Sequence, residues 1–335
     1  MLVRILLKNI KNYALCNVTV EFSPRKLSVI IGPNGSGKTT LLKVIAGLVP
    51  YEGDVFFDDK NVNNIPPYKR NVLYIPQKSS LFSHMKVWDN VAFCLEVRKA
   101  SRRVISERVK WALEKLSIEH LSEKYPSQLS GGEAKRVAIA RALVCEGNPL
   151  LFDELESYLD ANLRISIYEE VSKIAKELGL TVIVVTHDLD WAMSRADKIV
   201  FLWSGRVLYS GSPGELDPSL LEPKALAWLG SVLEVRDVDQ VHCNAIVGEQ
   251  SISLYPCIEG NFNIKKVYIP PDSAWIDPHG EIQGRIVDRV RFNGIEKTLI
   301  STDVGLIVAR SVQPSLAIGE NVGIRILRAI PLIEK

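Results

Sequence analysis

A glycine-rich octapeptide at residues 32–39 constrains the fold of this chain more than any other feature of its sequence. It reads Gly-Pro-Asn-Gly-Ser-Gly-Lys-Thr and fits the pattern G-x-x-x-x-G-K-[ST]. An uninterrupted apolar run at residues 27–31 precedes it, and apolar residues at positions 41, 42, 45 and 48 follow it at helical spacing. We therefore expect a buried strand, a tight loop and a helix in succession, as at the start of an α/β domain.

The chemistry of this loop points to a phosphate ligand. Glycines let the backbone curl so that successive N–H groups point inward, and the N-terminus of the following helix adds about half a positive charge. Lys38 is expected to reach the β- and γ-phosphates of a nucleotide, and the Thr39 hydroxyl to ligate Mg²⁺. The alternative is a glycine-rich turn with a chance lysine. The residues expected to contact the nucleotide here are Gly32, Pro33, Asn34, Gly35, Ser36, Gly37, Lys38, Thr39 and Thr40.

A hydrophobic run at residues 150–152 ends in two carboxylates, Asp153 and Glu154. Beside a phosphate-binding loop, this pattern predicts that Asp153 holds Mg²⁺ and that Glu154 orients and deprotonates the attacking water. Taken alone, the same pattern is also typical of a strand that ends at a solvated acidic loop.

A second glycine loop, Ser130-Gly131-Gly132-Glu133, precedes an amphipathic stretch. By the same N–H and dipole argument it is a second anion site. Because the sequence holds only one loop of the first kind, the second implies that two copies meet head to tail and close each other's nucleotide. The alternative is a plain helix start with Ser130 as N-cap.

Residues 1–230 alternate short apolar runs with amphipathic stretches, which is typical of an α/β domain with a mostly parallel sheet. From about residue 235 the apolar period becomes two, and Asn293-Gly294 separates two alternating segments as in a two-residue hairpin. Residues 211–229 are interpreted as a linker before a small β-barrel or sandwich. The expected strands are 27–31, 73–75, 150–152 and 181–185, and the expected helices are 87–99, 106–116, 133–145 and 161–178.

Composition excludes several classes of protein. The 335 residues carry 41 Lys and Arg against 39 Asp and Glu, so no bulk field attracts nucleic acid or an anionic membrane. No apolar run approaches the ~18 residues that a spanning helix needs, so a role at a membrane requires another subunit. The cysteines form no C-x-x-C pair and are interpreted as reduced and mostly buried, as in a cytosolic protein. They are Cys16, Cys94, Cys145, Cys243 and Cys257.

The order of these motifs resembles that of the ABC transporter ATPase family. The resemblance covers about residues 1–230 and rests on the octapeptide, Gln77, the loop at 129–133, Asp153-Glu154 and the stretches at 157–160 and 185–188. The five-residue loop Leu-Ser-Gly-Gly-Glu is nearly diagnostic. Leu155 departs from the proline that is common in the family, and Glu133 stands where many importers have glutamine.

The resemblance implies roles for further residues. Tyr13 resembles the aromatic on which adenine stacks, although alone it is also compatible with a strand residue facing a core. Gln77 is similar to the glutamine that contacts Mg²⁺ and the attacking water. His187 resembles the histidine that contacts the γ-phosphate, although a lone histidine at a strand end is usually structural. Asp160 is similar to the aspartate that crosses the dimer interface.

Residues 80–93 resemble the stretch of importer ATPases that receives the coupling helix of the membrane subunit, with Ser83 in place of the usual proline. Their mixture of aromatic, Met and charged residues suits a partly exposed groove. The alternative is that Phe82, Met85, Val87 and Phe93 pack inside the helical subdomain, and the two interpretations are compatible.

The tail is similar, over residues 284–287 and 319–326, to the small β-domain of oligonucleotide-fold type that follows the ATPase in importers of sugars, polyamines, iron, sulfate, molybdate and tungstate. The resemblance implies an α/β ATPase domain at 1–232, with an antiparallel β part and a helical subdomain at about 79–146, and a β-barrel domain at 233–335. In that family the tail braces the ATPase dimer, and in some members it binds a regulatory ligand. Two hypotheses stay open: an oxyanion sensor, or a brace with solvated arginines. The arginines concerned are Arg285, Arg289, Arg291 and Arg310.

Together these resemblances imply the ATP-hydrolysing subunit of an ABC importer, a homodimer that uses ATP and Mg²⁺ at the cytoplasmic face of the cell membrane. Its partners would be two transmembrane permease subunits and, indirectly, an extracellular substrate-binding protein, with no role for nucleic acid. The compact tail favours an oxyanion such as molybdate, tungstate or sulfate as cargo, and a sugar or polyamine is the alternative. A soluble ABC ATPase of translation or DNA maintenance, or an exporter ATPase, are further hypotheses.

Overall fold

The structure is a computed structural model that describes residues 3–78, 80–154, 161–217, 221–255, 257, 264–292, 295–310 and 316–333. Its contacts divide the chain into two compact units. The first comprises Met1–His187 with Ser204–Val207, and the second comprises Asp188–Trp203 with Leu208–Lys335. The domain boundary expected between residues 232 and 233 falls inside strand β11 (Ser231–Glu234) of the second unit.

A parallel sheet forms the core of the first unit and positions its polar residues. Its strands pair in the order β3-β8-β7-β6, and nearly all of their residues are buried, because continuous apolar runs suit a sheet that is covered on both faces. The residues that follow the strands therefore meet at one edge of the sheet, where parallel sheets bind ligands. The strands are β3 (Leu27–Ile31), β6 (Leu73–Ile75), β7 (Leu150–Asp153) and β8 (Val182–Val185).

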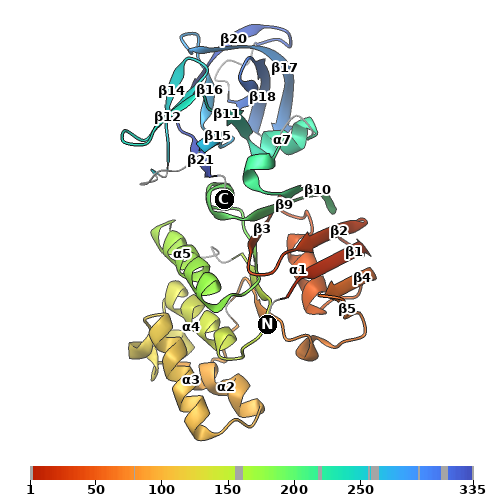
Figure 1. Cartoon of the computed structure of the whole chain (residues 1–335), viewed down its shortest axis with the longest axis vertical. Coiled ribbons are helices and arrows are strands. Elements are labelled where there is room, and N and C mark those ends of the chain that lie inside the picture. The colour runs from red at the N-terminus through yellow and green to blue at the C-terminus, as the bar shows by residue number, and fades with distance from the viewer. Residues whose placement is uncertain are drawn as a thin grey trace. The chain divides into compact units, whose positions relative to one another are not determined.

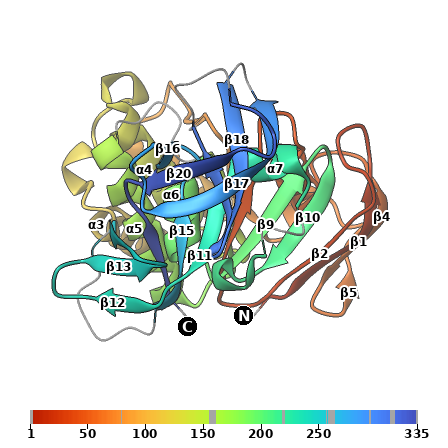
Figure 2. The same cartoon turned by 90° about the horizontal axis from the view of Figure 1, so that it is seen from above.

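An antiparallel sheet with the order β2-β1-β4-β5 completes the β structure of this unit, and its strands run side by side in Figures 1 and 2. Strand β1 alternates buried and exposed residues until a bulge between Leu7 and Ile10 shifts its register. Asn9, inside the bulge, has φ 53°, as a tight local kink requires. The strands are β1 (Ile5–Lys11), β2 (Val18–Phe22), β4 (Glu52–Phe57) and β5 (Lys60–Asn61).

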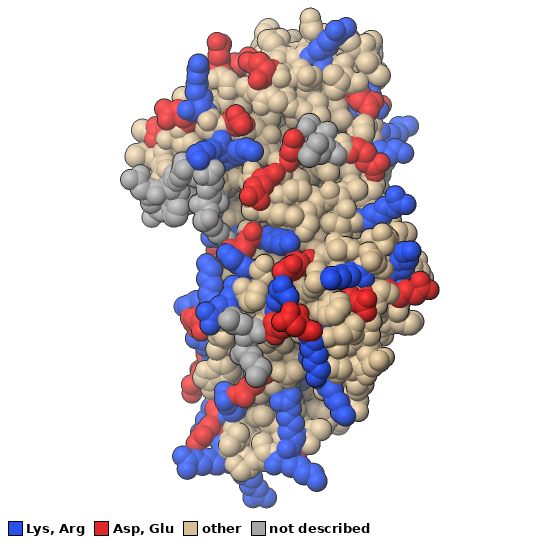
Figure 3. All heavy atoms as spheres, turned by 45° about the vertical axis from the view of Figure 1, so that its right-hand side comes forward, with Lys and Arg blue, Asp and Glu red and all other residues tan. Residues whose placement is uncertain are grey.

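Helices α2, α3 and α4 pack together as the helical part of the first unit (Figure 1). Helix α3 begins four residues before the expected start, since Ser101 caps it by accepting a hydrogen bond from Val104 N (3.4 Å). The helices are α1 (Lys38–Ala46), α2 (Val87–Val97), α3 (Arg102–Lys115), α4 (Gly131–Leu143) and α5 (Ala161–Leu178), with short 3₁₀ turns η1 (Pro67–Lys69), η2 (Glu119–Leu121) and η3 (Pro126–Gln128). Acidic and basic side chains are interspersed over the face drawn in Figure 3, with basic ones gathered at the end where α2 and α3 lie.

The second unit is mainly antiparallel β structure, in three sheets with the orders β11-β15-β21, β12-β13-β14 and β16-β20-β17-β18-β19. Phe292 pairs with Ile295, so strands β17 and β18 are joined by two residues, as the hairpin signal predicts. Asn293 and Gly294 themselves lie outside the described residues. The strands of these sheets, besides β11, are β12 (Asp237–Asp239), β13 (Asn244–Val247), β14 (Gln250–Ser253), β15 (Ile264–Ile269), β16 (Ala274–Ile276), β17 (Ile282–Phe292), β18 (Ile295–Thr302), β19 (Gly305–Ala309), β20 (Asn321–Ile326) and β21 (Ile330–Ile333). Strands β9 (Lys198–Trp203) and β10 (Arg206–Gly211) are neighbours in another sheet, outside these three. The helical turns of the second unit are α6 (Leu189–Arg195), η4 (Pro213–Glu215) and α7 (Pro223–Leu229).

The interpretation of residues 211–229 as a linker is wrong for its second half. Helix α7 starts with Pro223 and buries Leu226 and Ala227 in a small core with Val290 and Leu299. Proline suits the first turn of a helix, and the short apolar stripe after it gives the helix a face to bury.

The interpretation of the cysteines is also wrong. The structure joins Cys94 to Cys145 and Cys243 to Cys257 as disulfides, and Cys16, left unpaired among the described residues, is exposed. None of the five is buried. The paired cysteines are 51 and 14 residues apart in sequence, and spacing of that kind carries no signal of contact. Within the described ranges, none of the helices combines the length and apolarity needed to cross a membrane.

Candidate functional site

The octapeptide connects β3 to α1 as a loop shaped by glycines. Gly35 and Gly37 have φ values of 78° and 101°, which other residues rarely adopt, and Gly37 is the N-cap of α1. Lys38 is buried, and its Nζ donates to the carbonyls of Gly32 and Pro33, each at 2.9 Å. Ser36 is 2% exposed, and its Oγ has no hydrogen-bond partner among the described residues. A buried hydroxyl of this kind suits an anionic ligand seated in the loop.

Thr39 and Asp153 meet where α1 begins and β7 ends. Thr39 Oγ1 donates to Asp153 Oδ1 at 2.7 Å, and Tyr74 OH donates to Asp153 Oδ2 at 2.9 Å. Burial, together with the nearby Asp153 carboxylate, raises the pKa of Tyr74, so this phenol stays a donor. Hydroxyl, carboxylate and amide oxygens are ligands that Mg²⁺ accepts, and the donor set of Thr39, Asp153 and the neighbouring Gln77 fits this ion.

Glu154 lies between Gln77 and His187. Gln77 Nε2 donates to Glu154 Oε2 at 2.7 Å, and His187 Nε2 is 2.9 Å from Glu154 Oε1. The backbone of Glu154 has φ 48°, a left-handed conformation that is uncommon outside glycine, and its N–H donates to Val185 O at 3.0 Å. Such backbone strain clusters at functional sites, and here it turns the carboxylate out of the strand end toward the two partners.

Lys135 is a residue of this site that the sequence analysis missed. It is 2% exposed in helix α4, and its Nζ donates to the carbonyls of Gln77 (3.1 Å) and Pro76 (3.3 Å). The ammonium thereby holds the segment that carries Gln77. Its place on the apolar face of a helix is the only feature of the sequence that could have identified Lys135. Its acceptors are main-chain carbonyls, which every residue carries, so they leave no pattern in the sequence.

The second glycine loop forms the N-terminus of α4. Ser130 Oγ accepts from Glu133 N at 3.3 Å, and Glu133 Oε2 accepts from Ser130 N at 2.7 Å, which makes a capping box. The hydrogen bond from the Ser130 backbone lowers the pKa of Glu133. The alternative interpretation of Ser130 as an N-cap is confirmed, and the second anion site stays a prediction. Ser130 and Gly131 are exposed, and Gly132 is buried.

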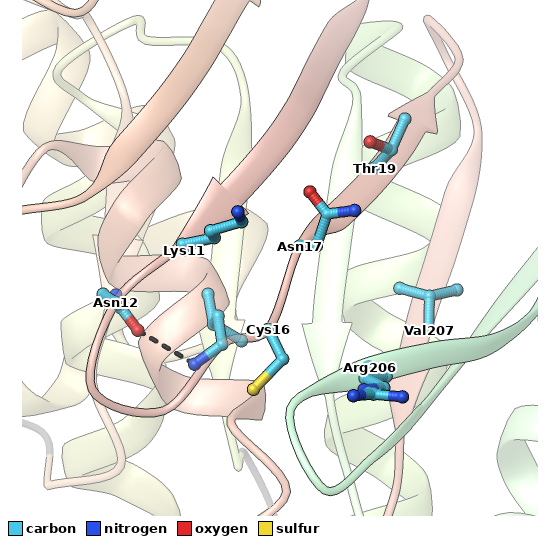
Figure 4. A pocket seen from close by; sticks show the side chains of 8 residues that line it. Lys11, Asn12, Cys16, Asn17, Thr19, Arg206 and Val207 are labelled. Atoms are coloured by element: carbon cyan, nitrogen blue, oxygen red, sulfur yellow. Dashed lines mark hydrogen bonds between the residues drawn. The ribbon is translucent and has the colours of Figure 1, made fainter.

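Tyr13 is 76% exposed, so it does not face a core. It belongs to a loop held by Asn12, whose Oδ1 accepts from Ala14 N (2.9 Å) and Leu15 N (3.0 Å). A cavity of about 880 Å³ beside this loop is lined by the end of β1, the segment that leads into β2, and the start of β10 (Figure 4). The turn that precedes β10 reaches the octapeptide, since Gly205 N donates to Ser36 O (3.1 Å) and Gly205 O accepts from Cys16 N (2.8 Å). The lining residues are Lys11, Asn12, Leu15, Cys16, Asn17, Thr19, Arg206 and Val207.

Residues 80–93 are organised by Asn90, which the sequence analysis did not single out. Asn90 is fully buried; its Oδ1 accepts from Phe82 N (2.8 Å), and its Nδ2 donates to the carbonyls of Phe82, Met85 and Lys86. Val87 is buried, whereas the Phe82 ring contacts Phe93 with 4.7 Å between ring centroids and stays partly exposed. The packing interpretation is therefore confirmed for Val87, and the groove for a coupling helix stays a prediction for the partly exposed Phe82 and Phe93.

Three of the four tail arginines are engaged by protein acceptors. Arg285 donates to Gly319 O at 2.9 Å, Arg289 pairs with Glu296, and Arg310 pairs with Asp272 at 2.7 Å. Arg291 lies on β17. These bonds show that the three side chains contact protein acceptors as well as solvent; whether the tail senses an oxyanion or braces a dimer stays a prediction.

Asp160, Leu155 and the rest of residues 155–160 lie outside the described residues, so the predicted contact of Asp160 across a dimer interface stays a prediction.

Comparisons with known proteins agree with the arrangement of these motifs. A family model described as ABC transporter matches residues 15–157. The spermidine/putrescine import ATP-binding protein PotA of Clostridioides difficile is 34% identical over 292 residues, which is 84% of this chain and 82% of that protein. The molybdate/tungstate import ATP-binding protein WtpC of Pyrococcus abyssi is 40% identical over 224 residues, 67% of this chain and 65% of that protein. The dimeric structure of the bacterial ABC transporter cassette MJ0796 aligns with a TM-score of 0.58 at 30% identity, covering 63% of this chain and 100% of that one.

Proposed function

Because the chain belongs to the ATP-binding proteins of ABC transporters, we propose that it hydrolyses ATP to drive import through two membrane-spanning permease subunits. The observation that carries this proposal is the placement of Glu154, which follows Asp153 at the end of β7 and contacts both Gln77 and His187. A carboxylate held by two polar partners beside a phosphate-binding loop is equipped to orient a water molecule and accept its proton.

The residues around the γ-phosphate have two proposed roles: some neutralise the phosphate charge, and others would hold Mg²⁺. Lys38 and the loop N–H groups offset the phosphate charge, with Lys38 exchanging its bonds to Gly32 and Pro33 for phosphate oxygens. Thr39, Asp153 and Gln77 would hold Mg²⁺, which supplies charge neutralisation of the β- and γ-phosphates when bound.

Tyr13 and the adjoining cavity are proposed to receive the base. The ring is exposed on a loop that Asn12 keeps in one conformation, and a flat exposed aromatic is the partner on which a base stacks. The turn at Gly205 forms hydrogen bonds with both Ser36 and Cys16. It therefore connects the octapeptide, which is proposed to bind the phosphates, to the loop of Tyr13, which is proposed to bind the base.

We propose that the second anion site serves a second copy of the chain. Ser130 and Gly131 are exposed, and the N-terminus of α4 adds its dipole, so this loop is free to face a nucleotide held by another molecule. The similarity to a dimeric cassette supports a homodimer, and we propose that two ATP molecules bind at its interface. Asp160 is proposed to cross the same interface.

The segment ordered by Asn90 is proposed to receive the coupling helix of the permease. Phe82 and Phe93 are partly exposed there, and Gln77 links this segment to Glu154, so closure around ATP would be transmitted to the membrane subunits. A peripheral position at the cytoplasmic face of the membrane follows from that contact. We further propose an ATPase domain at 1–232 and a β-domain at 233–335 that braces the dimer.

For the cargo we propose an oxyanion such as molybdate or tungstate, delivered by an external substrate-binding protein. The similarity to WtpC supports it, whereas the similarity to PotA supports the alternative, a polyamine. Uptake of labelled molybdate and labelled putrescine by cells with and without this chain separates the two.

The test of the central proposal is Glu154→Gln. The amide keeps an acceptor for Gln77 and can donate to His187, so the geometry of the site survives while the base is lost. We expect the hydrolysis rate to fall about 10²- to 10⁴-fold. ATP affinity should stay close to that of the wild type, and closed dimers should accumulate in light scattering.

Glu119→Gln, the same change at an exposed position of η2, is the matched control and should leave the rate unchanged. Normal turnover in E154Q would remove Glu154 from the role of base. A chain that hydrolyses ATP as a monomer and copurifies with ribosomes or DNA instead of permeases would favour the soluble alternative.

A further inference from the structure

A cavity of about 300 Å³ lies in the first unit between β6, α2 and α4. Its wall holds two cysteines of the same disulfide, one on α2 and one just after α4. We call this cavity the 94/145 pocket and define it by Tyr74, Phe82, Phe93, Cys94, Arg141 and Cys145. The aromatic residues Phe82 and Phe93 of the proposed permease groove therefore share a cavity with this disulfide.

The two cysteines are placed for thiol–disulfide exchange. Their Cα atoms are 6.0 Å apart, within the range that a disulfide spans without backbone movement. Both residues are half-buried and line the cavity, so a small reductant or oxidant reaches the sulfurs through it. Such access distinguishes labile disulfides from those sealed in a core.

The Cys94–Cys145 disulfide joins two segments of the chain that have different proposed functions. Cys94 lies on α2, the helix whose Asn90 orders the proposed permease groove. Cys145 lies five residues before β7, the strand that ends at Asp153 and leads into Glu154. A covalent link therefore ties the groove helix to the chain that enters the catalytic strand. A hydrogen bond from Arg98 Nη1 to Cys145 O (2.7 Å) runs in parallel and would remain after reduction.

The pocket also holds a charged side chain that joins its two walls. Arg141 of α4 donates to Ser80 O at 3.0 Å and lies over the Phe82 ring, 5.3 Å from its centroid. Desolvation by burial lowers the pKa of Arg141, so this guanidinium is largely covered by the surrounding side chains. Release of α2 from Cys145 would loosen the wall that keeps this guanidinium covered.

We propose that Cys94 and Cys145 form a reversible redox site that regulates ATP turnover, with the disulfide as the restrained form and the dithiol as the active form. The proposal rests on the proposed function of the groove and of Glu154. ATP turnover in such enzymes depends on conformational steps, and a cross-link between the groove helix and the chain entering β7 restricts them.

The reaction is an exchange with a dithiol. One thiolate of the reductant attacks one sulfur of the Cys94–Cys145 bond, forms a mixed disulfide and releases the other cysteine as a thiol. The second thiolate of the reductant then displaces the remaining cysteine, so two electrons and two protons pass to the protein and the reductant becomes a disulfide.

The experiment uses the full-length chain equilibrated with dithiothreitol or with oxidised glutathione. Mass-tagged alkylation of the denatured protein counts thiols at Cys94 and Cys145, and ATP hydrolysis is measured on the same samples. We expect the pair to change between zero and two free thiols, and the reduced protein to turn over ATP about fivefold faster or more, the low end of coupling between two sites. Cys94→Ser with Cys145→Ser should hydrolyse ATP at the reduced rate in both conditions.

The second disulfide supplies the matched control. Cys243→Ser with Cys257→Ser removes the same chemistry from the second unit and should keep the full redox response. A single Cys94→Ser variant repeats the test if the double variant folds poorly. A pair that never exchanges, or equal ATP hydrolysis by both redox forms of the wild type, overturns the inference. Absence of hydrolysis in both forms would contradict the proposed function, and thiol counting would then decide the redox site by itself.

Discussion

Arg70 closes the C-terminal end of helix α1, the helix whose first residues belong to the phosphate-binding loop. It is 5% exposed, and its guanidinium donates to the carbonyls of Val44 (3.0 Å), Ile45 (3.1 Å) and Ile65 (2.9 Å). A fork of fixed N–H groups meets all three acceptors at once, and the positive charge lies at the negative end of the helix dipole.

The free energy lost on removing this side chain follows from its acceptors. Val44 O also accepts a bond from Gly47 N–H (3.0 Å), so it keeps a partner. The buried carbonyl of Ile45 loses its bond from Arg70, and a buried group left unsatisfied costs about 1–3 kcal/mol. The Ile65 carbonyl and the Tyr51 hydroxyl also accept from Arg70, but both groups are only partly buried and lose less. With the lost charge at the helix end, Arg70→Met should lower the free energy of unfolding by about 2–5 kcal/mol.

Urea denaturation followed by circular dichroism measures this loss, and hydrogen exchange in α1 assigns the transition to the first unit. Arg70→Lys keeps the positive charge but lacks the forked guanidinium, so its free energy of unfolding should lie between that of the wild type and that of Arg70→Met. Arg103→Ala removes an exposed arginine paired with Glu107 and should change stability by less than about 1 kcal/mol. If Arg70→Met were as stable as Arg103→Ala, the assignment of Arg70 as a helix-end anchor would be refuted.

Two further changes test the nucleotide loop and the second glycine loop. Tyr13→Ala should raise the Kd for ATP about 5- to 150-fold, since base stacking on an aromatic contributes about 1–3 kcal/mol, while Tyr13→Phe should bind normally. Titration with a fluorescent ATP analogue measures both, and unchanged affinity in Tyr13→Ala would remove the base from this loop. Because the pKa of Glu133 is lowered in the folded chain, its carboxylate stabilises the protein above the unfolded pKa, and this contribution is lost as pH falls through the lowered value. Glu133→Gln keeps the capping geometry, so the Tm difference from wild type should be present at neutral pH and vanish in acid; a difference independent of pH would contradict the capping assignment.

The predictions from sequence that hold share a physical basis. Three elements have the bounds expected from the sequence: strands 27–31 and 73–75 and helix 161–178. A buried strand and an amphipathic helix can be recognised because each has a characteristic pattern of apolar residues along a continuous stretch of sequence. The first turn of α3 was missed, since Arg102 and Arg103 are exposed and add nothing to the apolar period. The linker interpretation failed at α7 because seven residues with one buried stripe give little periodic signal.

The residues of the candidate site that were predicted from the sequence also lie in short local motifs. Lys38, Thr39, Asp153 and Glu154 were identified from the sequence because each motif is a short stretch whose loop geometry is set by its own residues. Their order and spacing along the chain carried the resemblance to a known family, and the comparisons agree with it.

Contacts between distant segments were decided by the tertiary structure alone. Tyr74 reaches Asp153 across 79 residues, Lys135 reaches Gln77 across 58, and Cys94 meets Cys145 across 51. A separation of this length in the sequence does not determine whether two side chains are close in space. These partners meet only when the helices pack and the strands align. The sequence therefore specified which groups react, and the packed fold specified which groups hold them in place.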